Sequence, residues 1–294
     1  MWYELTEWAR RYYYLTKPGI VISNALTATA GYLFATSQVM PNWVAGVAVI
    51  IGTSLVIASA CVINNIIDRD IDRKMERTKE RSLVTGRIAI HNAAAFAVML
   101  GVLGFTALTI WTNTTTVLIG AIAYVWYIVI YGYSKRRSEH GTLIGTVPGA
   151  LPAVAGYVAL MGRIDLAAVI IFLMMVTWQM AHFYAIAIYR RAEYKKAGVP
   201  ILTVTRGNKP AIQQMIVYII AFAIVSVNLT ISGYTGIIYA VVMIGLAAWW
   251  LIRALRALPQ KGKALETAAR GLFGQSLVIN LAMCFMIAIG GYLL

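Results

Sequence analysis

Residues 64–72, Asn-Asn-Ile-Ile-Asp-Arg-Asp-Ile-Asp, follow directly on an apolar run that ends near Ile63. If the helix of that run continues, Asn64, Asp68 and Asp72 are spaced at i, i+4 and i+8. Successive members then rotate by only ~40° and rise by ~6 Å, so their oxygens line one stripe of the helix. Carboxylates stacked in this way repel one another unless a cation lies between them. Hard oxygen ligands suit Mg²⁺, which in such sites usually also holds a phosphate-bearing substrate.

The alternative interpretation of this stripe is a solvated polar helix end that carries Asp–Arg pairs. The position of the stripe decides between the two interpretations. It starts inside an apolar span, where polar groups cost free energy and tend to be functional. We therefore predict a Mg²⁺ site on Asn64, Asp68 and Asp72.

Composition places the chain in lipid rather than in water. Of its 294 residues, 60% are hydrophobic and 12% are charged, and the mean hydropathy is +0.74. Such a chain has too much apolar surface for a water-soluble globular protein. The net charge of +14 is compatible with nucleic-acid binding, but the basic residues are distributed as in a membrane protein, so no nucleic-acid partner is expected. Cys61 and Cys284 lie inside apolar runs and are expected to be packing residues.

Nine apolar runs are each long enough to cross ~30 Å of hydrocarbon as a helix. We therefore predict an all-α polytopic membrane protein, with residues 1–294 forming one transmembrane domain. The segment 1–17, with Trp8 beside Arg10 and Arg11, is expected to lie at the headgroups. No cleavable signal peptide is expected, because the first apolar run is long enough to remain as a span. The predicted spans are 19–36, 43–63, 91–111, 114–133, 142–160, 165–186, 211–231, 234–252 and 272–293.

Lysine and arginine predict the orientation of these spans. All but one of the 25 basic residues fall in the N-terminal segment or in the segments 64–90, 134–137, 190–209 and 253–270. Arg163 is the exception. The positive-inside rule then places the N-terminus and every long loop in the cytoplasm. All acidic residues except Asp165 share that face, and acids contribute little to topology, so their density indicates a functional site.

Two long cytoplasmic segments, 64–90 and 187–209, are the expected active-site segments. In the first, Arg77 and Arg81 lie one turn apart, and arginine forks bind phosphate oxygens. Their alternative is ordinary pairing with neighbouring glutamates. Near the second, His182 lies close to the end of a span, where its alternatives are a hydrogen bond to a neighbouring helix or contact with substrate, including ligation of iron.

One span is unusually rich in helix-breaking residues, namely Gly145, Pro148, Gly149, Pro152 and Gly156. We expect a kinked helix there that gives either close helix contact or room for a bulky ligand. Ordinary glycine enrichment in membrane helices is the alternative.

The spacing Asn64-x3-Asp68-x3-Asp72 matches the first aspartate motif of the UbiA superfamily of intramembrane prenyltransferases. Further stretches resemble the haem-farnesylating branch of that superfamily, and the likeness covers nearly the whole chain. The sequence departs from the branch pattern at Glu193, where Asp is usual, and at Ser82, where Pro is usual. The matching stretches are Asp68–Asp72 with Met75, Arg77, Thr78 and Arg81; Lys135-Arg136 with Ile144-Gly145 and Gly149-Ala150-x-Pro152; Trp178-Gln179-Met180-x-His182-Phe183 through Tyr194, Ala197-Gly198 and Pro200; and Arg270 with Phe273-Gly274-x-Ser276.

The resemblance implies a nine-helix UbiA-type bundle that transfers a farnesyl group from farnesyl diphosphate to a vinyl group of haem B. Water addition then gives haem O. Mg²⁺ is the implied cofactor. The expected catalytic residues are Asn64, Asp68, Asp72, Arg77 and Lys135, and the expected substrate-binding residues are Arg81, Tyr131, Arg136, His182, Arg190, Glu193 and Tyr194.

The resemblance also implies a bacterial plasma-membrane location, with the active site at the cytoplasmic face, and contact with haem A synthase or the terminal-oxidase assembly. Two other functions stay open at this point. A sibling prenyltransferase acting on an aromatic quinone precursor would share the first motif. A cation or metabolite transporter would more naturally carry charges near the bilayer midplane.

Overall fold

The structure is a computed structural model that describes residues 2–294, with side chains from residue 6 onward. Met1, the first residue of the predicted interfacial segment, lies outside the described residues. Every regular element between residues 2 and 294 is helical. In chain order these elements are α1 (Trp2–Leu15), α2 (Pro18–Thr36), α3 (Trp43–Ile67), α4 (Arg69–Asp72), α5 (Ile90–Trp111), α6 (Thr114–Val125), the π-helical turn η1 (Trp126–Tyr131), α7 (Gly132–Arg137), α8 (Gly141–Met161), α9 (Leu166–Tyr189), α10 (Arg191–Ala197), α11 (Leu202–Thr205), α12 (Asn208–Ile231), α13 (Ile237–Ala257) and α14 (Gly262–Gly290).

The predicted nine spans are confirmed. Within residues 2–294, nine helices are long and apolar enough to cross a membrane, and α6, η1 and α7 together form one of them. The largest difference is at α14, which begins at Gly262 although the predicted span begins at 272. Its first turns carry Lys263, Glu266 and Arg270, which are all exposed, so the helix extends beyond its apolar part.

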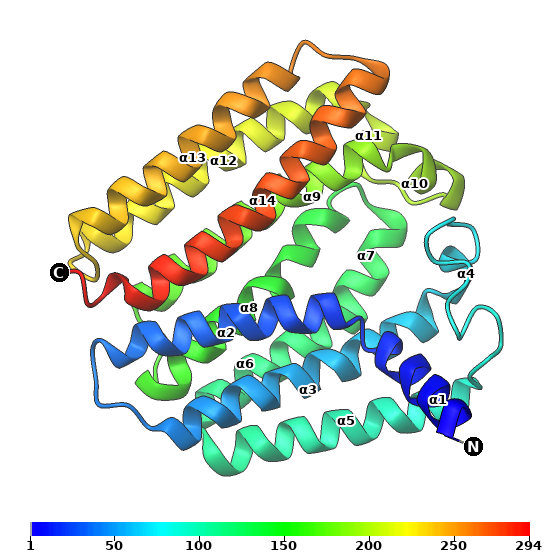
Figure 1. Ribbon diagram of the computed structural model, residues 1–294, viewed down its shortest axis with the longest axis horizontal. Helices are drawn as coiled ribbons and strands as arrows, with labels where there is room; N and C mark the ends of the chain where they lie inside the picture. Colours follow the sequence, from blue (N-terminus) through cyan, green and yellow to red (C-terminus); the bar gives the residue numbers. More distant parts are fainter. Residues whose placement is uncertain (1) are drawn as a thin grey trace.

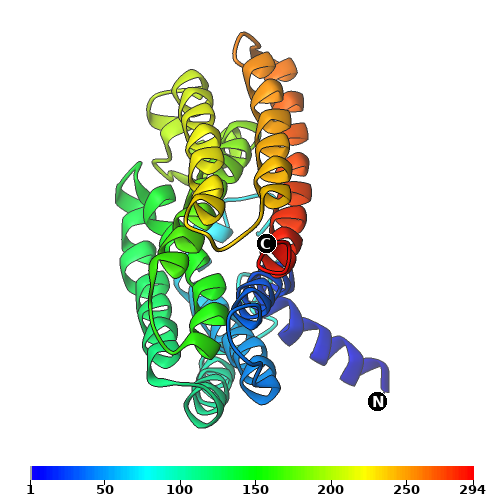
Figure 2. The same cartoon turned by 90° about the vertical axis from the view of Figure 1, so that its left-hand side faces the viewer.

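The long helices lie side by side in a bundle (Figure 1). One group contains α2, α3, α5, α6 and α8, and the other contains α9, α12, α13 and α14; α8 packs on α9, and α2 packs on α14. The two chain ends lie at opposite ends of the bundle, as an odd number of crossings requires (Figure 1). The short helices α4, α10 and α11 lie at the same end as the N-terminus, while α1 extends away from the bundle (Figures 1 and 2).

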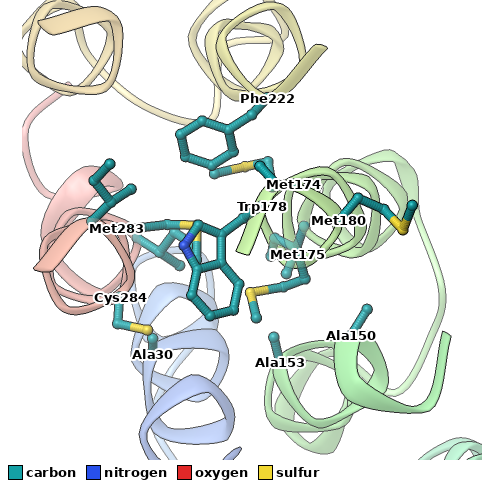
Figure 3. Packing of buried hydrophobic residues seen from close by; sticks show 14 of the residues in the cluster. Ala30, Ala150, Ala153, Met174, Met175, Trp178, Met180, Phe222, Met283 and Cys284 are labelled. Atoms are coloured by element: carbon teal, nitrogen blue, oxygen red, sulfur yellow. The ribbon is translucent and has the colours of Figure 1, made fainter. Parts of the chain in front are cut away.

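The centre of the bundle is filled mainly by α9. Met174, Met175 and Trp178 are buried there between α2, α8, α12 and α14 (Figure 3). The indole nitrogen of Trp178 points towards α14 (Figure 3), where it donates a hydrogen bond of 2.9 Å to the carbonyl oxygen of Ser276. The flexible side chains of Met174 and Met175 can fill irregular gaps between these helices. The buried hydrogen bond of Trp178 fixes the register of α9 against α14.

The crossing of α2 and α8 depends on glycine. A Cβ atom added to Gly156 would lie 1.9 Å from the carbonyl oxygen of Ala28, and one added to Gly31 would lie 2.0 Å from that of Ala153. Small residues at such crossings let helix backbones approach closely in a membrane. The close contact predicted from the glycine-rich span is therefore confirmed at Gly156.

Gly156→Ala is expected to destabilise the bundle by about 1–3 kcal/mol, because the new methyl group must push the backbones of α2 and α8 apart. The matched control is Gly245→Ala in α13, where an added Cβ meets nothing within 4 Å. That control should unfold at an unchanged or higher temperature, since alanine favours helix over glycine. Thermal unfolding of both variants in detergent measures the difference, and equal melting temperatures would contradict the prediction.

Candidate active site

A cavity of about 690 Å³ lies among α2, α3, α6, α8, α9 and α14. Its size is typical of a ligand site. One part of its wall is charged, whereas most of the rest is apolar and includes Val56, Leu108, Ile119, Leu151, Met175 and Leu277. The cavity therefore combines a polar region with room for a hydrophobic group.

The predicted stripe of oxygens lines this cavity, although the helix is interrupted within it. α3 ends at Ile67, and Asp68 has φ −87° and ψ 6°. The backbone N–H of Asp68 donates to the carbonyl oxygen of Asn64 at 2.9 Å, and that of Asp72 donates to Asp68 at 2.8 Å. Because these bonds keep the helical spacing, Asn64, Asp68 and Asp72 all face the cavity, and all three are buried.

The two carboxylates are paired with bases from other segments. Asp68 forms an ion pair with Lys135 of α7. Asp72 accepts a hydrogen bond of 2.6 Å from Arg81, which also donates to the side-chain oxygen of Asn65 at 3.0 Å. An unpaired buried carboxylate would cost several kcal/mol, so these bases hold the loop after α4 and the end of α7 against α3.

Lys17 completes this group, and its role was not predicted from the sequence. Its ammonium donates to the side-chain oxygen of Asn64 at 2.6 Å. Burial lowers the pKa of Lys17 to about 8. Lys17 is also the one non-glycine residue within 2–294 with a positive φ, at 54°, although it directly precedes Pro18. Both features cost free energy, which is common at functional sites.

The π-helical turn orients two tyrosines. Tyr127 and Tyr131 line the cavity, and their rings stack with centroids 5.5 Å apart. The ammonium of Lys135 lies 5.3 Å from the centroid of Tyr131. Tyr131 was predicted and Tyr127 was not, because the sequence gives no clear signal for a π-helical turn. Together they form an electron-rich aromatic wall beside the charged region.

Three other predicted residues line the same cavity from its outer side. Arg77 has no ion-pair partner among the described side chains. The guanidinium of Arg190 lies 5.1 Å from the ring centroid of Tyr189. Burial raises the pKa of Tyr194, so its hydroxyl remains a neutral donor. Arg77 is therefore free to donate to an anion in the cavity, and Arg190, which also pairs with Glu193, has further N–H groups that can do so.

The structure does not bring Arg136 and Glu193 to the cavity wall. Arg136 donates two hydrogen bonds of 2.8 Å to the carboxylate of Asp70 and one to the carbonyl oxygen of Ile67, and it also lies 3.4 Å from the carboxylate of Asp68, which lines the cavity. Its hydrogen bonds lower the pKa of Asp70 to about 2. Glu193 pairs with Arg190 at 3.0 Å. Both residues therefore lie one contact away from the cavity.

The charged region fits a metal–diphosphate complex. Five basic side chains and two carboxylates line the cavity, so an anion is favoured there. Among the side chains that the structure describes, from residue 6 onward, no group of three or more His, Cys, Asp or Glu is arranged to hold a metal. The chain offers two carboxylates and one amide, and Mg²⁺ commonly takes its other ligands from phosphate and water. The amide nitrogen of Asn64 is buried without a hydrogen-bond partner, so its N–H groups can donate to a phosphate oxygen.

Comparison with known families identifies the fold and the chemistry class. The model of the UbiA prenyltransferase family matches residues 24–286. The chain belongs to this family. UbiA membership makes the protein a prenyltransferase, which decides against the transporter alternative.

Curated UbiA-family relatives extend over nearly the full length of the chain. It is 42% identical over 287 residues to "Protoheme IX farnesyltransferase 1" of Shewanella frigidimarina, covering 97% of this chain and 94% of that protein. It is also 42% identical over 284 residues to "Protoheme IX farnesyltransferase 2" of Chromobacterium violaceum, covering 96% and 93%. The resemblance found in the sequence is confirmed.

Solved structures confirm the UbiA fold at lower sequence identity. A digeranylgeranylglyceryl phosphate synthase structure superposes with a TM-score of 0.79 at 20% identity, covering 97% of this chain and 99% of that one. A UbiA homologue from Archaeoglobus fulgidus bound to GPP and Mg²⁺ gives a TM-score of 0.66 at 17% identity, covering 94% and 99%.

The lowered pKa of Lys17 predicts an alkaline limit for prenyl transfer. Below about pH 8 its ammonium is charged and can hold an anion, and above that pH it loses its proton. Lys17→Arg should move the alkaline fall in rate to higher pH, because arginine stays protonated. Lys17→Met should be slow at every pH. A rate profile across neutral and alkaline pH tests this, and an identical alkaline fall in the wild type and Lys17→Arg would contradict it.

Proposed function

We propose that this protein transfers a farnesyl group from farnesyl diphosphate to a vinyl group of haem B, with addition of water, to give haem O and diphosphate. The observation that carries the proposal is the 42% identity to protoheme IX farnesyltransferases over nearly the whole chain. The cavity supports it, because its charged region suits a diphosphate and its apolar wall suits a farnesyl chain.

Asn64, Asp68 and Asp72 are the residues that would hold Mg²⁺. When bound, Mg²⁺ supplies positive charge next to the diphosphate. The GPP- and Mg²⁺-bound UbiA homologue supports this cofactor for the fold. Around these ligands, Arg77, Lys135 and Arg190 line the same cavity as hydrogen-bond donors for phosphate oxygens.

The first step breaks the bond between the allylic carbon and the diphosphate oxygen. Negative charge grows on the departing diphosphate, and donors fixed in a cavity of low dielectric stabilise it more than water does. Tyr127 and Tyr131 present aromatic faces to the positive charge that develops on the allylic carbon. The apolar wall keeps bulk water from capturing that carbon.

The second step forms a carbon–carbon bond between the allylic carbon and a vinyl carbon of haem. The haem side chain is left with a positive charge, which the oxygen of one water molecule neutralises as that water releases a proton. Farnesyl diphosphate, haem and water thereby give haem O, diphosphate and one proton. The chain must therefore admit one water molecule near the haem while it protects the allylic carbon.

We place the active site at the cytoplasmic face of a bacterial plasma membrane. The concentration of basic residues at the end of the bundle that carries the charged region supports this orientation. Haem O is held in the membrane by its farnesyl tail, so its next user should take it up within the membrane. We therefore expect this protein to contact haem A synthase or the terminal-oxidase assembly.

Asp68→Asn should lower the rate of haem O formation about 100-fold or more, because it removes charge from the residue that pairs with Lys135 and faces the cavity. The assay uses purified protein with haem B, farnesyl diphosphate and Mg²⁺, and detects haem O by its mass. Glu76→Gln is the control, since Glu76 is exposed in the same segment and pairs with Lys79.

Two outcomes of that assay would reject parts of the proposal. Normal turnover by Asp68→Asn would reject the role of the stripe. If the wild-type protein leaves haem B unchanged and prenylates an aromatic quinone precursor, the proposed acceptor is wrong, but the proposed first step stands.

Removal of divalent metal should abolish turnover. Chelation followed by gel filtration should give protein that is inactive until Mg²⁺ is returned, because without a cation between them the carboxylates of Asp68 and Asp72 repel the diphosphate. Full activity in excess chelator would contradict a role for Mg²⁺.

A further inference from the structure

His182 lies on α9 in the wall of the cavity, away from the carboxylates of the charged region. Its ring stacks on Trp178, with centroids 5.1 Å apart and an interplanar angle of 26°. Phe273 of α14 and Phe183 contact the same ring, with centroids at 5.0 Å and 5.4 Å. Three aromatic neighbours therefore fix the plane of the imidazole.

One hydrogen bond determines which ring nitrogen carries the proton. Nδ1 of His182 lies 2.7 Å from the hydroxyl oxygen of Ser276. That hydroxyl lies 2.6 Å from the carbonyl oxygen of Phe273, and a carbonyl can only accept. Because the serine hydroxyl has a single hydrogen and gives it to Phe273, it must accept from Nδ1. The neutral imidazole is consequently protonated on Nδ1.

Nε2 of His182 is then left with an unshared electron pair. It makes no hydrogen bond or ion pair with any described residue, yet it is not among the fully buried atoms that lack a partner. Since His182 is a lining residue, the open side of Nε2 is the cavity. The ring thus presents a fixed, unprotonated nitrogen to whatever the cavity holds.

The surroundings indicate what this nitrogen can bind. Among the described side chains no further His, Cys, Asp or Glu joins it in a cluster that could hold a free metal ion. A single neutral imidazole between aromatic rings suits a metal that brings its other ligands with it on a flat, apolar macrocycle. A hydrogen bond from the distal ring N–H is the usual way to orient such a ligand.

We propose that Nε2 of His182 is an axial ligand to the iron of the haem substrate, with Ser276 as the positioning residue that sets its tautomer. This inference rests on the proposed function, because that function supplies haem as the acceptor. Ligation would hold the macrocycle at a fixed depth on α9 and so limit which of its edges can reach the allylic carbon. An aromatic quinone precursor has no metal and would make no use of Nε2.

The test compares haem B with metal-free protoporphyrin IX, which has the same shape and side chains but no iron. Wild-type protein should bind haem B at least about tenfold more tightly than the metal-free ring, and its ferrous complex should show an iron–histidine vibration. His182→Ala should lose the preference and the vibration while keeping its affinity for protoporphyrin IX. Added imidazole should restore the haem spectrum. A purely structural histidine would weaken both ligands equally.

Ser276→Ala should weaken haem binding and shift the iron–histidine vibration, because the ring loses its fixed acceptor. Ser276→Thr keeps a hydroxyl and should behave as the wild type. His91→Ala and His140→Ala are the matched controls, since these exposed residues are the other two of the three histidines in the chain.

If His182→Ala does not fold, the vibrational spectrum of the wild-type haem complex still decides. A wild-type complex without a nitrogen ligand to iron rejects the inference, and haem O formation by that same protein leaves the proposed function standing. If the complex is histidine-ligated but forms no haem O, iron ligation by His182 stands and the proposed farnesyl transfer is rejected.

Discussion

Two carboxylates buried at the end of one membrane helix impose the constraint on which this structure depends. Asp68 and Asp72 lie where α3 gives way to α4, and both are almost inaccessible to solvent. A buried charge without a partner costs several kcal/mol, so each needs a base, and no base lies on α3 itself. Arg81 comes from the loop nine residues after Asp72, whereas Lys135 lies 67 residues beyond Asp68, on α7. The balance of charge thereby brings distant parts of the sequence to one end of the bundle.

The same constraint explains how one cavity holds two kinds of surface. The charged groups are supplied mainly by α3, α4, α7 and the loop after α4, whereas His182, Trp178 and Phe273 come from α9 and α14. α8 lies between these groups and packs closely on α2 through its small residues. A phosphate-bearing substrate and a flat aromatic one can therefore meet in the cavity without competing for the same side chains.

Much of this architecture could be predicted because lipid leaves the backbone few alternatives. An apolar run of sufficient length must satisfy its own hydrogen bonds, so hydropathy alone located the spans. Hydropathy missed the first turns of α14, because a helix continues through Lys263 and Glu266 once it has left the bilayer. The stripe of Asn64, Asp68 and Asp72 was predictable because its spacing survives the break at Asp68.

The parts of the site that could not be predicted depend on tertiary contacts. From the sequence, Lys17 is expected only to help set the orientation of the first span. Its left-handed backbone and its hydrogen bond to Asn64 become visible only once α2 is packed on α3. Arg136 and Glu193 carry the expected charge, but Arg136 forms an ion pair with Asp70 and Glu193 forms one with Arg190. Local pattern gives the residue type at such positions, whereas the neighbours determine which partner it meets.

The π-helical turn in the fourth span has a consequence for how this site can vary. A turn of this kind holds one residue more than an α-helical turn. If this turn relaxed to an ordinary α-helix with all of its residues kept, the extra residue would advance the helix by one position, and everything beyond it would rotate by about 100°. Lys135, which pairs with Asp68, follows this turn, so its ammonium would then point away from that carboxylate. The π-helical geometry of residues 126–131 thus determines which side chain of α7 meets Asp68.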